Sequence, residues 1–184
     1  MSASGDVLLV CSGGGHLRQL DGWAQRLGIE PERQVWATFR NGLSESLLAG
    51  RRIEYVPYTA PRDLPNFARV AREAWRIVRG GNFSAALSTG SSPAVGFLPL
   101  ATLMGIPCYY IESAARADGP SLTCRMIARF PSIRTFCQYP GWADSRWLYR
   151  GSIFDGFEPV APSGSGSPRR AVVTVGTQVG YPFT

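Results

Sequence analysis

Three short stretches of small and polar residues contain the side chains that could carry out chemistry. The first, residues 12–16 with the sequence S-G-G-G-H, follows an apolar run and precedes apolar residues at helical spacing. A glycine turn between a buried strand and a helix leaves backbone N–H groups pointing outward, and the helix dipole favours negative charge there. This stretch predicts a site for a phosphate-bearing ligand; the alternative is a turn that only lets the helix pack close to the strand.

The second stretch, residues 89–92 with the sequence T-G-S-S, follows another apolar run and precedes Pro93. A serine cap followed by proline is typical of a helix start, so this stretch predicts either a second anion or hydroxyl site or simple capping. The third stretch, residues 112–116 with the sequence E-S-A-A-R, begins where a buried run ends, and an unpaired carboxylate is costly there. We expect Glu112 to pair with Arg116 or with a ligand hydroxyl.

Composition excludes several kinds of chemistry. All nineteen basic residues are arginine, so the chain has neither a Walker A lysine nor a Schiff-base lysine. Residues 12–16 do not form the G-x-G-x-x-G dinucleotide fingerprint, and no carboxylate follows the second expected strand to hold a ribose. The single histidine, His16, and the lack of a C-x-x-C pair predict no metal site and reduced core cysteines. The net charge of +6 favours an anionic partner.

The spacing of apolar residues predicts strands that alternate with helices. Expected strands span 7–10, 34–39, 52–57, 84–88, 107–111, 133–138 and 147–149, and expected helices span 17–27, 42–49, 66–79, 93–104 and 121–130. This alternation is typical of an α/β fold with a Rossmann-like, doubly wound and mostly parallel sheet. Such sheets bind ligands beyond the carboxyl ends of their strands, where all three polar stretches lie.

The expected helix 66–79 has one apolar, aromatic face and one arginine face. A helix of this kind can lie on an anionic bilayer with its aromatic side chains in the interface. Taken alone, however, the pattern favours the commoner case of a sheet-covering helix with a solvated charged face. The residues that would contact a membrane are Phe67, Arg69, Arg72, Trp75, Arg76 and Arg79. The longest apolar stretch, 93–106, falls short of the roughly 20 residues that a membrane span needs, and no signal peptide is visible.

The composition changes near the end of the sequence. Residues 159–170 are rich in proline, glycine and serine and predict a flexible linker. Residues 171–176 then read as another buried strand. Either this strand docks onto the first sheet or a second domain has been cut short, and we favour the second interpretation. We therefore expect one domain over 1–158, a linker over 159–170 and the truncated start of another domain over 171–184.

Several motifs, in the same order, resemble those of a known family. They are S-G-G-G-H (12–16), S-T-G-S-S-P-A (88–94), I-E-S-x-A-R (111–116), P-S-L-T-C-R (120–125) and F-C-Q-Y-P (136–140). The resemblance is to the acceptor-binding subunit of two-part family-28-like glycosyltransferases, which act on dolichol- and undecaprenyl-diphosphate-linked sugars. V-T-V-G-T-Q-x-x-Y-P-F (173–183) resembles the opening of the donor-binding partner. Cys124 stands where the family has glycine, and the transmembrane anchor of eukaryotic relatives is not seen, as in bacterial relatives.

The resemblance implies a GT-B architecture, with this chain as the acceptor-binding half. The residues that it implies for the acceptor and its diphosphate are Ser12, Gly13, Gly14, Gly15, His16, Thr89, Gly90, Ser91, Ser92, Glu112, Ser113 and Arg116. On the donor side it implies Gly176, Thr177 and Gln178. It implies no cofactor, because the UDP-sugar is a co-substrate. The helix 66–79 would then rest on the membrane, which reverses the preference stated above.

The implied reaction is an inverting transfer, in which an acceptor hydroxyl attacks the anomeric carbon of a UDP-sugar and UDP leaves. His16, kept neutral by a helix N-terminus, is either the base or only a hydrogen-bond donor to a phosphate, and Glu112 is the alternative base. The implied partners are a polyprenyl-diphosphate-linked saccharide, an anionic membrane surface and a donor-binding domain or subunit, with no nucleic acid. The implied location is cytoplasmic, peripheral on the inner face of the plasma membrane. The competing hypothesis is a non-catalytic nucleotide- or phosphate-binding Rossmann module, or an NADP-dependent reductase fragment with Arg40 near the 2′-phosphate.

Overall fold

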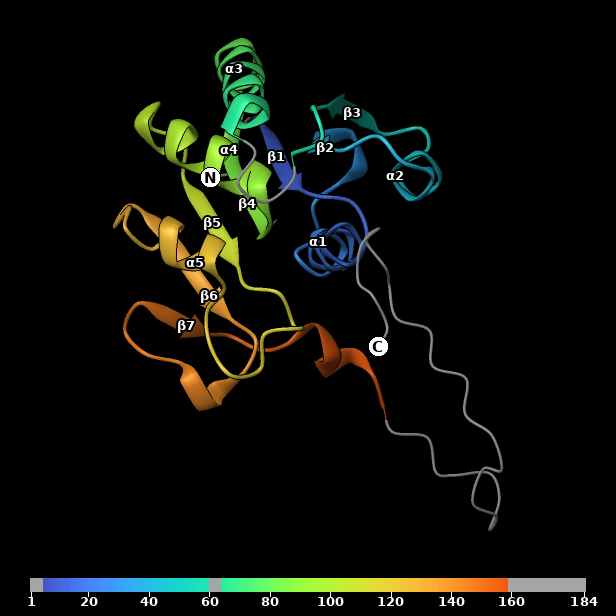
Figure 1. Cartoon of the computed structure of the whole chain (residues 1–184). Helices are drawn as coiled ribbons and strands as arrows, with labels where there is room; N and C mark the ends of the chain where they lie inside the picture. The colour runs from blue at the N-terminus through green and yellow to red at the C-terminus, as the bar shows by residue number, and fades with distance from the viewer. Residues whose placement is uncertain (1–4, 60–63, 159–184) are drawn as a thin grey trace, which may run out of the picture.

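The computed structural model describes residues 5–59 and 64–158, which form one seven-stranded sheet. Its strands are β1 (Asp6–Cys11), β2 (Gln34–Thr38), β3 (Arg52–Tyr55), β4 (Phe83–Gly90), β5 (Cys108–Ile111), β6 (Ile133–Cys137) and β7 (Trp147–Tyr149). Their spatial order is β3-β2-β1-β4-β5-β6-β7, and every neighbouring pair is parallel (Figure 1). The α/β, Rossmann-like, doubly wound sheet expected from the sequence is confirmed.

Helices cover both faces of this sheet. They are α1 (Gly15–Arg26), α2 (Gly42–Leu47), α3 (Leu64–Gly80), α4 (Ser92–Leu103) and α5 (Leu122–Ile127), with short 3-10 turns η1 (Pro31–Arg33), η2 (Pro140–Trp142) and η3 (Ile153–Gly156). One core layer packs the sheet against α1 and α2, and the other packs it against α3, α4 and α5. β1 lies inside the sheet between β2 and β4, and its Leu8 and Leu9 point into opposite layers and are both fully buried. Four successive apolar residues therefore form a strand because both of its faces are covered.

The direction of the chain through the sheet reverses between β1 and β4. From β1 the chain moves outward through β2 to β3, then returns through α3 to β4 and proceeds outward in the other direction. In doubly wound sheets the crevice at such a switch point, beyond the carboxyl ends of the two strands, is where ligands bind. Residues 12–16 run from the turn after β1 into the start of α1, and residues 89–92 run from the end of β4 into the start of α4. The first two polar stretches thus lie at the switch point.

The helix α3 buries only part of its apolar face. Val70, Ala74, Ile77 and Val78 are buried, whereas Trp75 is 48% exposed. The buried side packs against α4, whose Gly96 lies so close that an added Cβ would be 3.2 Å from a methyl carbon of Val70. Trp75, which the sequence predicts as a membrane contact, therefore lies outside the buried part of the helix.

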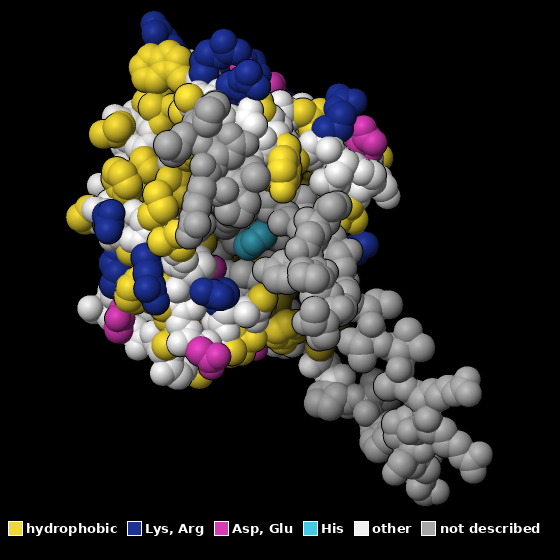
Figure 2. Space-filling view, in the orientation of Figure 1, with side chains coloured by type: hydrophobic (Ala, Val, Ile, Leu, Met, Phe, Trp, Pro, Cys, Tyr) yellow, Lys and Arg dark blue, Asp and Glu magenta, His cyan; other side chains and the backbone are white. Residues whose placement is uncertain are grey.

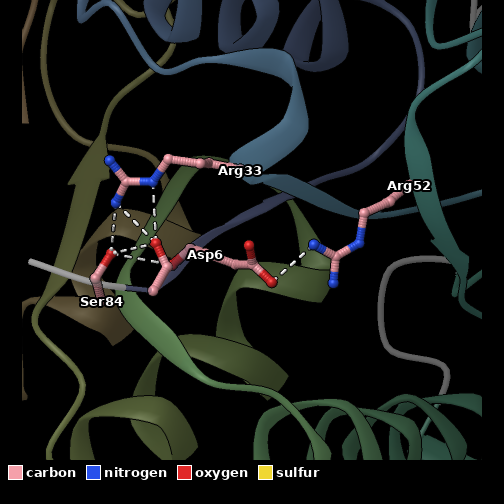
Figure 3. A network of polar contacts seen from close by, with 5 residues as sticks. Asp6, Arg33, Arg52 and Ser84 are labelled. Carbon is pink, nitrogen blue, oxygen red and sulfur yellow. Dashed lines mark hydrogen bonds and ion pairs between the residues drawn. The ribbon is translucent and has the colours of Figure 1, made fainter.

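The amino edge of the sheet is closed by a polar network (Figure 3). Asp6 at the start of β1 accepts a hydrogen bond from the Arg52 guanidinium at 2.8 Å. Arg33, just before β2, donates to the backbone oxygen of Gly5 at 2.7 Å, and the Ser84 hydroxyl donates to the same oxygen at 3.2 Å. These contacts join the beginnings of the first four strands in the chain. Their position and their mutual pairing indicate a structural role.

On the side of the sheet that carries α1, the strands β4, β5 and β6 are covered less completely by helices. A cavity of about 440 Å³ lies between α1 and the strands β4, β5 and β6. Its walls are largely apolar and include Trp23, Tyr109 and Phe136, with Arg150 at one end. Among the described helices, none is long and apolar enough to cross a bilayer. The expected linker and the start of a second domain, residues 159–184, lie outside the described residues, and so do Gly176, Thr177 and Gln178.

Candidate functional site at the sheet switch point

His16 joins the two turns at the switch point. It lies in the first turn of α1, and its Nδ1 is 2.8 Å from the Thr89 carbonyl oxygen. In return, the Thr89 hydroxyl donates to the His16 carbonyl oxygen at 2.8 Å. Because a carbonyl can only accept, Nδ1 carries the proton, and a neutral ring then keeps Nε2 as an acceptor. The sequence assigned both residues to a ligand site but did not predict that they bond to each other.

The His16 side chain is held in its neutral form. Burial lowers its pKa below the ordinary value, and this effect outweighs the hydrogen bond to Thr89 and the negative charge of Glu112, which both favour protonation. Figure 2 shows this single histidine reaching the surface of the molecule. The ring is therefore neutral near pH 7 and accessible at the carboxyl edge of the sheet. It has the properties of a general base.

The two helices that begin at the switch point start from unusual backbone conformations. Gly14 precedes α1 with a φ of 72°, and Ser91 precedes α4 with a φ of 74° and a ψ of −179°. Ser91 is the one non-glycine residue with positive φ among the described residues, in a region that is essentially restricted to glycine. Such strain gathers at functional sites, because the surroundings must hold it in place.

Neither of these helix starts has a side-chain cap in the described part of the chain. The expected serine cap of α4 is therefore wrong, although proline does occupy its first turn. The Ser92 hydroxyl donates instead to the Thr59 carbonyl oxygen at 3.2 Å. First-turn N–H groups without a side-chain acceptor are a favourable place for an anion.

Two glycines of the site are required by close contacts. A Cβ on Gly90, whose φ is 118°, would lie 2.8 Å from the Tyr110 hydroxyl oxygen and 3.2 Å from Cε1 of His16. A Cβ on Gly13 would lie 2.1 Å from Nδ2 of Asn41, the residue that caps α2. The Asn41 side chain therefore packs against the turn at Gly13, a contact that the sequence pattern did not predict. Gly15, by contrast, faces open space, since no atom lies within 4 Å of its added Cβ.

The partners of Glu112 differ from those expected. Its side chain is 1% exposed and makes no ion pair with Arg116 among the described residues. Instead, Oε1 accepts a hydrogen bond from the backbone N–H of Ser113 at 2.9 Å, and Oε2 accepts one from the N–H of Ser121 at 2.7 Å. The Tyr110 hydroxyl is a further, longer partner at 3.5 Å. The carboxylate thus bridges the two ends of the loop 113–120, while Arg116 is exposed.

Two glutamines, which the sequence pattern did not assign to the site, support the same loop. Gln19, one turn after His16 on α1, accepts from the N–H of Ala114 at 2.9 Å and donates to the Ser113 hydroxyl at 3.1 Å. Gln138, just after β6, donates to the Glu112 carbonyl oxygen at 2.8 Å. The available signal was their polarity: Gln138 ends an apolar strand, and Gln19 stands between the apolar positions of a helix.

The cysteines and the other reactive side chains of the described residues show no second cluster. The four cysteines are free and buried. No cluster of three or more metal-ligating side chains occurs among residues 5–59 and 64–158. Arg40, which the reductase hypothesis places at a 2′-phosphate, lies 4.3 Å from the centre of the Tyr55 ring and 3.5 Å from a Glu45 oxygen.

Comparison with solved structures places this fold among known ones. MurG from Acinetobacter baumannii aligns with a TM-score of 0.64 and 17% sequence identity, over 79% of this chain and 45% of MurG. The UDP-GlcNAc 2-epimerase from Methanocaldococcus jannaschii aligns with a TM-score of 0.53 and 7% identity, over 73% of this chain and 39% of the epimerase. No family model matches the sequence, and no curated protein matches it. The chain therefore has the fold of one half of a GT-B protein and spans less than half the length of these structures.

Proposed function

We propose that the chain is the acceptor-binding half of an inverting GT-B glycosyltransferase. The enzyme would transfer a sugar from a UDP-sugar to a polyprenyl-diphosphate-linked saccharide in cell-surface polysaccharide biosynthesis. The observation that carries this proposal is the hydrogen-bonded junction of His16 and Thr89 at the switch point. The motifs of the sequence support it, as does the fold shared with MurG, a GT-B glycosyltransferase with a lipid-linked substrate.

The acceptor diphosphate is assigned to the starts of α1 and α4. Both helices present first-turn N–H groups, and both are preceded by turns of small residues that let a phosphate approach the backbone. The residues around this position are Ser12, Gly13, Gly14, Gly15, Thr89, Gly90, Ser91 and Ser92. We also assign Ser113 and Arg116, in the loop after β5, to this ligand, because the guanidinium of Arg116 adds positive charge for the diphosphate.

His16 is the proposed base. Its Nδ1 is fixed by Thr89, so Nε2 is the atom that takes the proton of the acceptor hydroxyl as this hydroxyl attacks the anomeric carbon. The bond from the anomeric carbon to the UDP oxygen breaks, and UDP leaves with the electron pair. Glu112 is the weaker alternative, because it is buried and both of its oxygens already accept backbone hydrogen bonds.

The donor side of the reaction lies beyond the described residues. We assign the UDP-sugar to a donor-binding domain or subunit, to which Gly176, Thr177 and Gln178 would contribute. The alignment with MurG covers less than half of MurG, which agrees with a chain that supplies one wall of a two-part site. In the absence of this donor-binding domain or subunit, the chain is expected to bind acceptor without transferring sugar.

The helix α3 is the proposed contact with an anionic membrane. Arginine and apolar side chains gather over it in Figure 2. The exposed Trp75 indole lies beside Arg79, whose guanidinium is 5.8 Å from the ring centre. Arg76 contributes less, because it is paired with Glu54 and Glu73 at 2.8 Å each. The other proposed contacts are Phe67, Arg69 and Arg72. The proposed location is cytoplasmic, peripheral on the inner face of the plasma membrane.

The proposal is tested by flotation of the chain with vesicles of phosphatidylglycerol and phosphatidylcholine, with and without undecaprenyl diphosphate. We expect the chain to float with the anionic vesicles and more of it to float when the prenyl diphosphate is present. Replacing Trp75 by alanine should reduce flotation on both kinds of vesicle. The matched control is Phe154→Ala, which removes an aromatic side chain of similar exposure, 55%, from η3.

Two outcomes would contradict the proposal. One is equal binding to vesicles with and without undecaprenyl diphosphate, which would remove the acceptor site. The other is calorimetric binding of NADP together with no vesicle association, which would favour the reductase hypothesis.

A further inference from the structure

The loop 113–120 after β5 is held from two sides by groups that do not themselves face the ligand. We propose that Glu112 and Gln19 are positioning residues, which fix this loop so that Arg116 is presented to the acceptor diphosphate. This inference rests on the proposed function, and it gives Glu112 a role other than that of a base.

The contacts of Glu112 close the loop at its base. Its two carboxylate oxygens bind the N–H of Ser113, at the start of the loop, and the N–H of Ser121, at its end. Ser121 also caps α5, since its hydroxyl accepts from the N–H of Cys124 at 3.1 Å. Hydrogen bonds from backbone N–H groups to a buried carboxylate are charge-assisted and stronger than neutral ones. One side chain therefore determines where the loop begins and where it ends.

The contacts of Gln19 fix the middle of the loop to α1. Its amide oxygen accepts from the N–H of Ala114 at 2.9 Å and from Nε2 of Gln138 at 3.1 Å. Its amide nitrogen donates to the Ser113 hydroxyl at 3.1 Å. The Tyr139 hydroxyl donates to the Ala114 carbonyl oxygen at 2.6 Å from the side of β6. The N–H and the carbonyl oxygen of Ala114 are thus held from α1 and from the segment after β6.

Arg116 is the residue of the held loop that would bind the acceptor diphosphate. The N–H of Arg116 donates to the Ser113 carbonyl oxygen at 2.9 Å, which forms a tight turn directly after the held segment. Its side chain is exposed, and no carboxylate pairs with it in the described part of the chain. A guanidinium without an ionic partner on a fixed backbone suits bidentate binding of a phosphate, because little conformational freedom is lost on binding.

The test is a double-mutant cycle with inorganic pyrophosphate as the probe, measured by calorimetry on the whole chain. We expect Arg116→Ala and Glu112→Gln each to weaken binding by about tenfold, a typical size for one charge-assisted contact. Because Glu112 acts through Arg116, the double variant should bind no more weakly than Arg116→Ala alone. Independent weakening by Glu112→Gln in the Arg116→Ala background would overturn the proposal.

Hydrogen exchange without any ligand tests the positioning separately. Glu112→Gln must place an amide N–H against a backbone N–H, and Gln19→Leu removes three hydrogen bonds, so both should speed exchange within 113–121. Gln19→Glu should preserve protection, because a carboxylate accepts from the same N–H groups and from the Ser113 hydroxyl. The control is Gln25→Leu, at the other end of α1, where the amide bonds only Asp21. Unchanged exchange in both loop variants would refute the positioning role, whereas a wild-type chain that binds no pyrophosphate would refute the proposed acceptor site.

Discussion

The two edges of the sheet differ in how their polar groups are used. At the amino edge, Asp6 is paired with Arg52, and Asp21 of α1 is paired with Arg51 at 2.6 Å. At the carboxyl edge, His16 keeps one ring nitrogen as an acceptor, and Arg116 is exposed without an ionic partner among the described residues. The strands and helices that supply the two edges are the same, so the fold alone does not create the difference.

The two edges also differ in backbone strain, which occurs at the carboxyl edge. The carboxyl edge contains the strained Ser91 and the close approach of Gly90 to His16. The amino edge consists of ion pairs and hydrogen bonds between oppositely polar groups (Figure 3). We therefore expect changes at the carboxyl edge to alter binding and transfer, and changes at the amino edge to alter stability alone.

The largest expected effect is on transfer. In the chain combined with its donor-binding half, His16→Gln should lower the transfer rate by about 100-fold or more, the usual contribution of a general base. Arg52→Gln, at the amino edge, is the control and should leave the rate within about twofold, because a surface ion pair contributes little. Equal rates for wild type and His16→Gln in a radiolabelled-sugar assay would show that another group removes the proton.

The next effect is on stability at the carboxyl edge. Gly90→Ala should lower the free energy of unfolding by about 3 kcal/mol, because it combines a positive φ with a contact inside van der Waals distance. Gly15→Ala should change it by less than about 0.5 kcal/mol, since its Cβ enters open space at a helical position. Urea unfolding of both variants measures the two values. Similar losses for the two would mean that Gly90 does not pack against His16.

Two neighbouring arginines at the amino edge, Arg51 and Arg52, allow a largely buried ion pair to be compared with an exposed one. Arg51 is largely buried with Asp21, whereas the Arg52 side chain is 58% exposed. Arg51→Gln should therefore lower the free energy of unfolding by about 2 kcal/mol, and Arg52→Gln by less than about 1 kcal/mol. Neither should change the affinity for pyrophosphate. A loss of pyrophosphate binding in either variant would break the proposed separation of the two edges.

A smaller gain is expected from relief of strain. Ser91→Gly should raise the free energy of unfolding by about 1 kcal/mol, because glycine adopts positive φ without a Cβ clash. Ser92→Gly is the control and should destabilise the protein, since it removes the hydrogen bond to Thr59. A loss of stability in Ser91→Gly would show that the serine hydroxyl matters more than the backbone strain.

The smallest expected effect is a pH dependence from His16. Its pKa is lowered on folding, so the unfolded chain binds the proton more tightly and protonation favours unfolding. The contribution of His16 to stability is therefore complete above about pH 6.5 and declines as the pH falls below that value. NMR titration of the single histidine should give a pKa below 6.5, and His16→Gln should lack this part of the pH dependence. A pKa above 6.5 would contradict a neutral base.

The strands and the switch-point turns could be predicted from sequence because burial leaves a local signal. Four apolar residues at 7–10 indicate a strand covered on both faces, and a glycine turn after it indicates a helix start. The ends of the helices were predicted less closely, because caps and packing determine them. For example, α5 ends at Ile127, before the expected residue 130. Which apolar residues of α3 are buried depends in the same way on a tertiary contact, because α3 packs against α4.

The details of the site could not be predicted because they depend on contacts between distant parts of the chain. Gly13 approaches Asn41, and Gln19 bonds to Ala114, ninety-five positions later. The charge on Glu112 suggested an arginine or a ligand as its partner, yet backbone N–H groups satisfy it. Sequence identifies a buried carboxylate, but the path of the following loop determines which donors reach it.

The outermost strands have a further consequence for how the molecule behaves in a crowded solution. The sheet ends in β3 and β7, which are four and three residues long, and β3 carries the charged Arg52 and Glu54. Two such short outer strands offer few unpaired backbone groups to the strand of another molecule, and the charges on β3 add to this effect. The sheet is thus a poor template for strand-by-strand growth, so the chain is expected to resist fibrillar aggregation even though part of one sheet face is apolar.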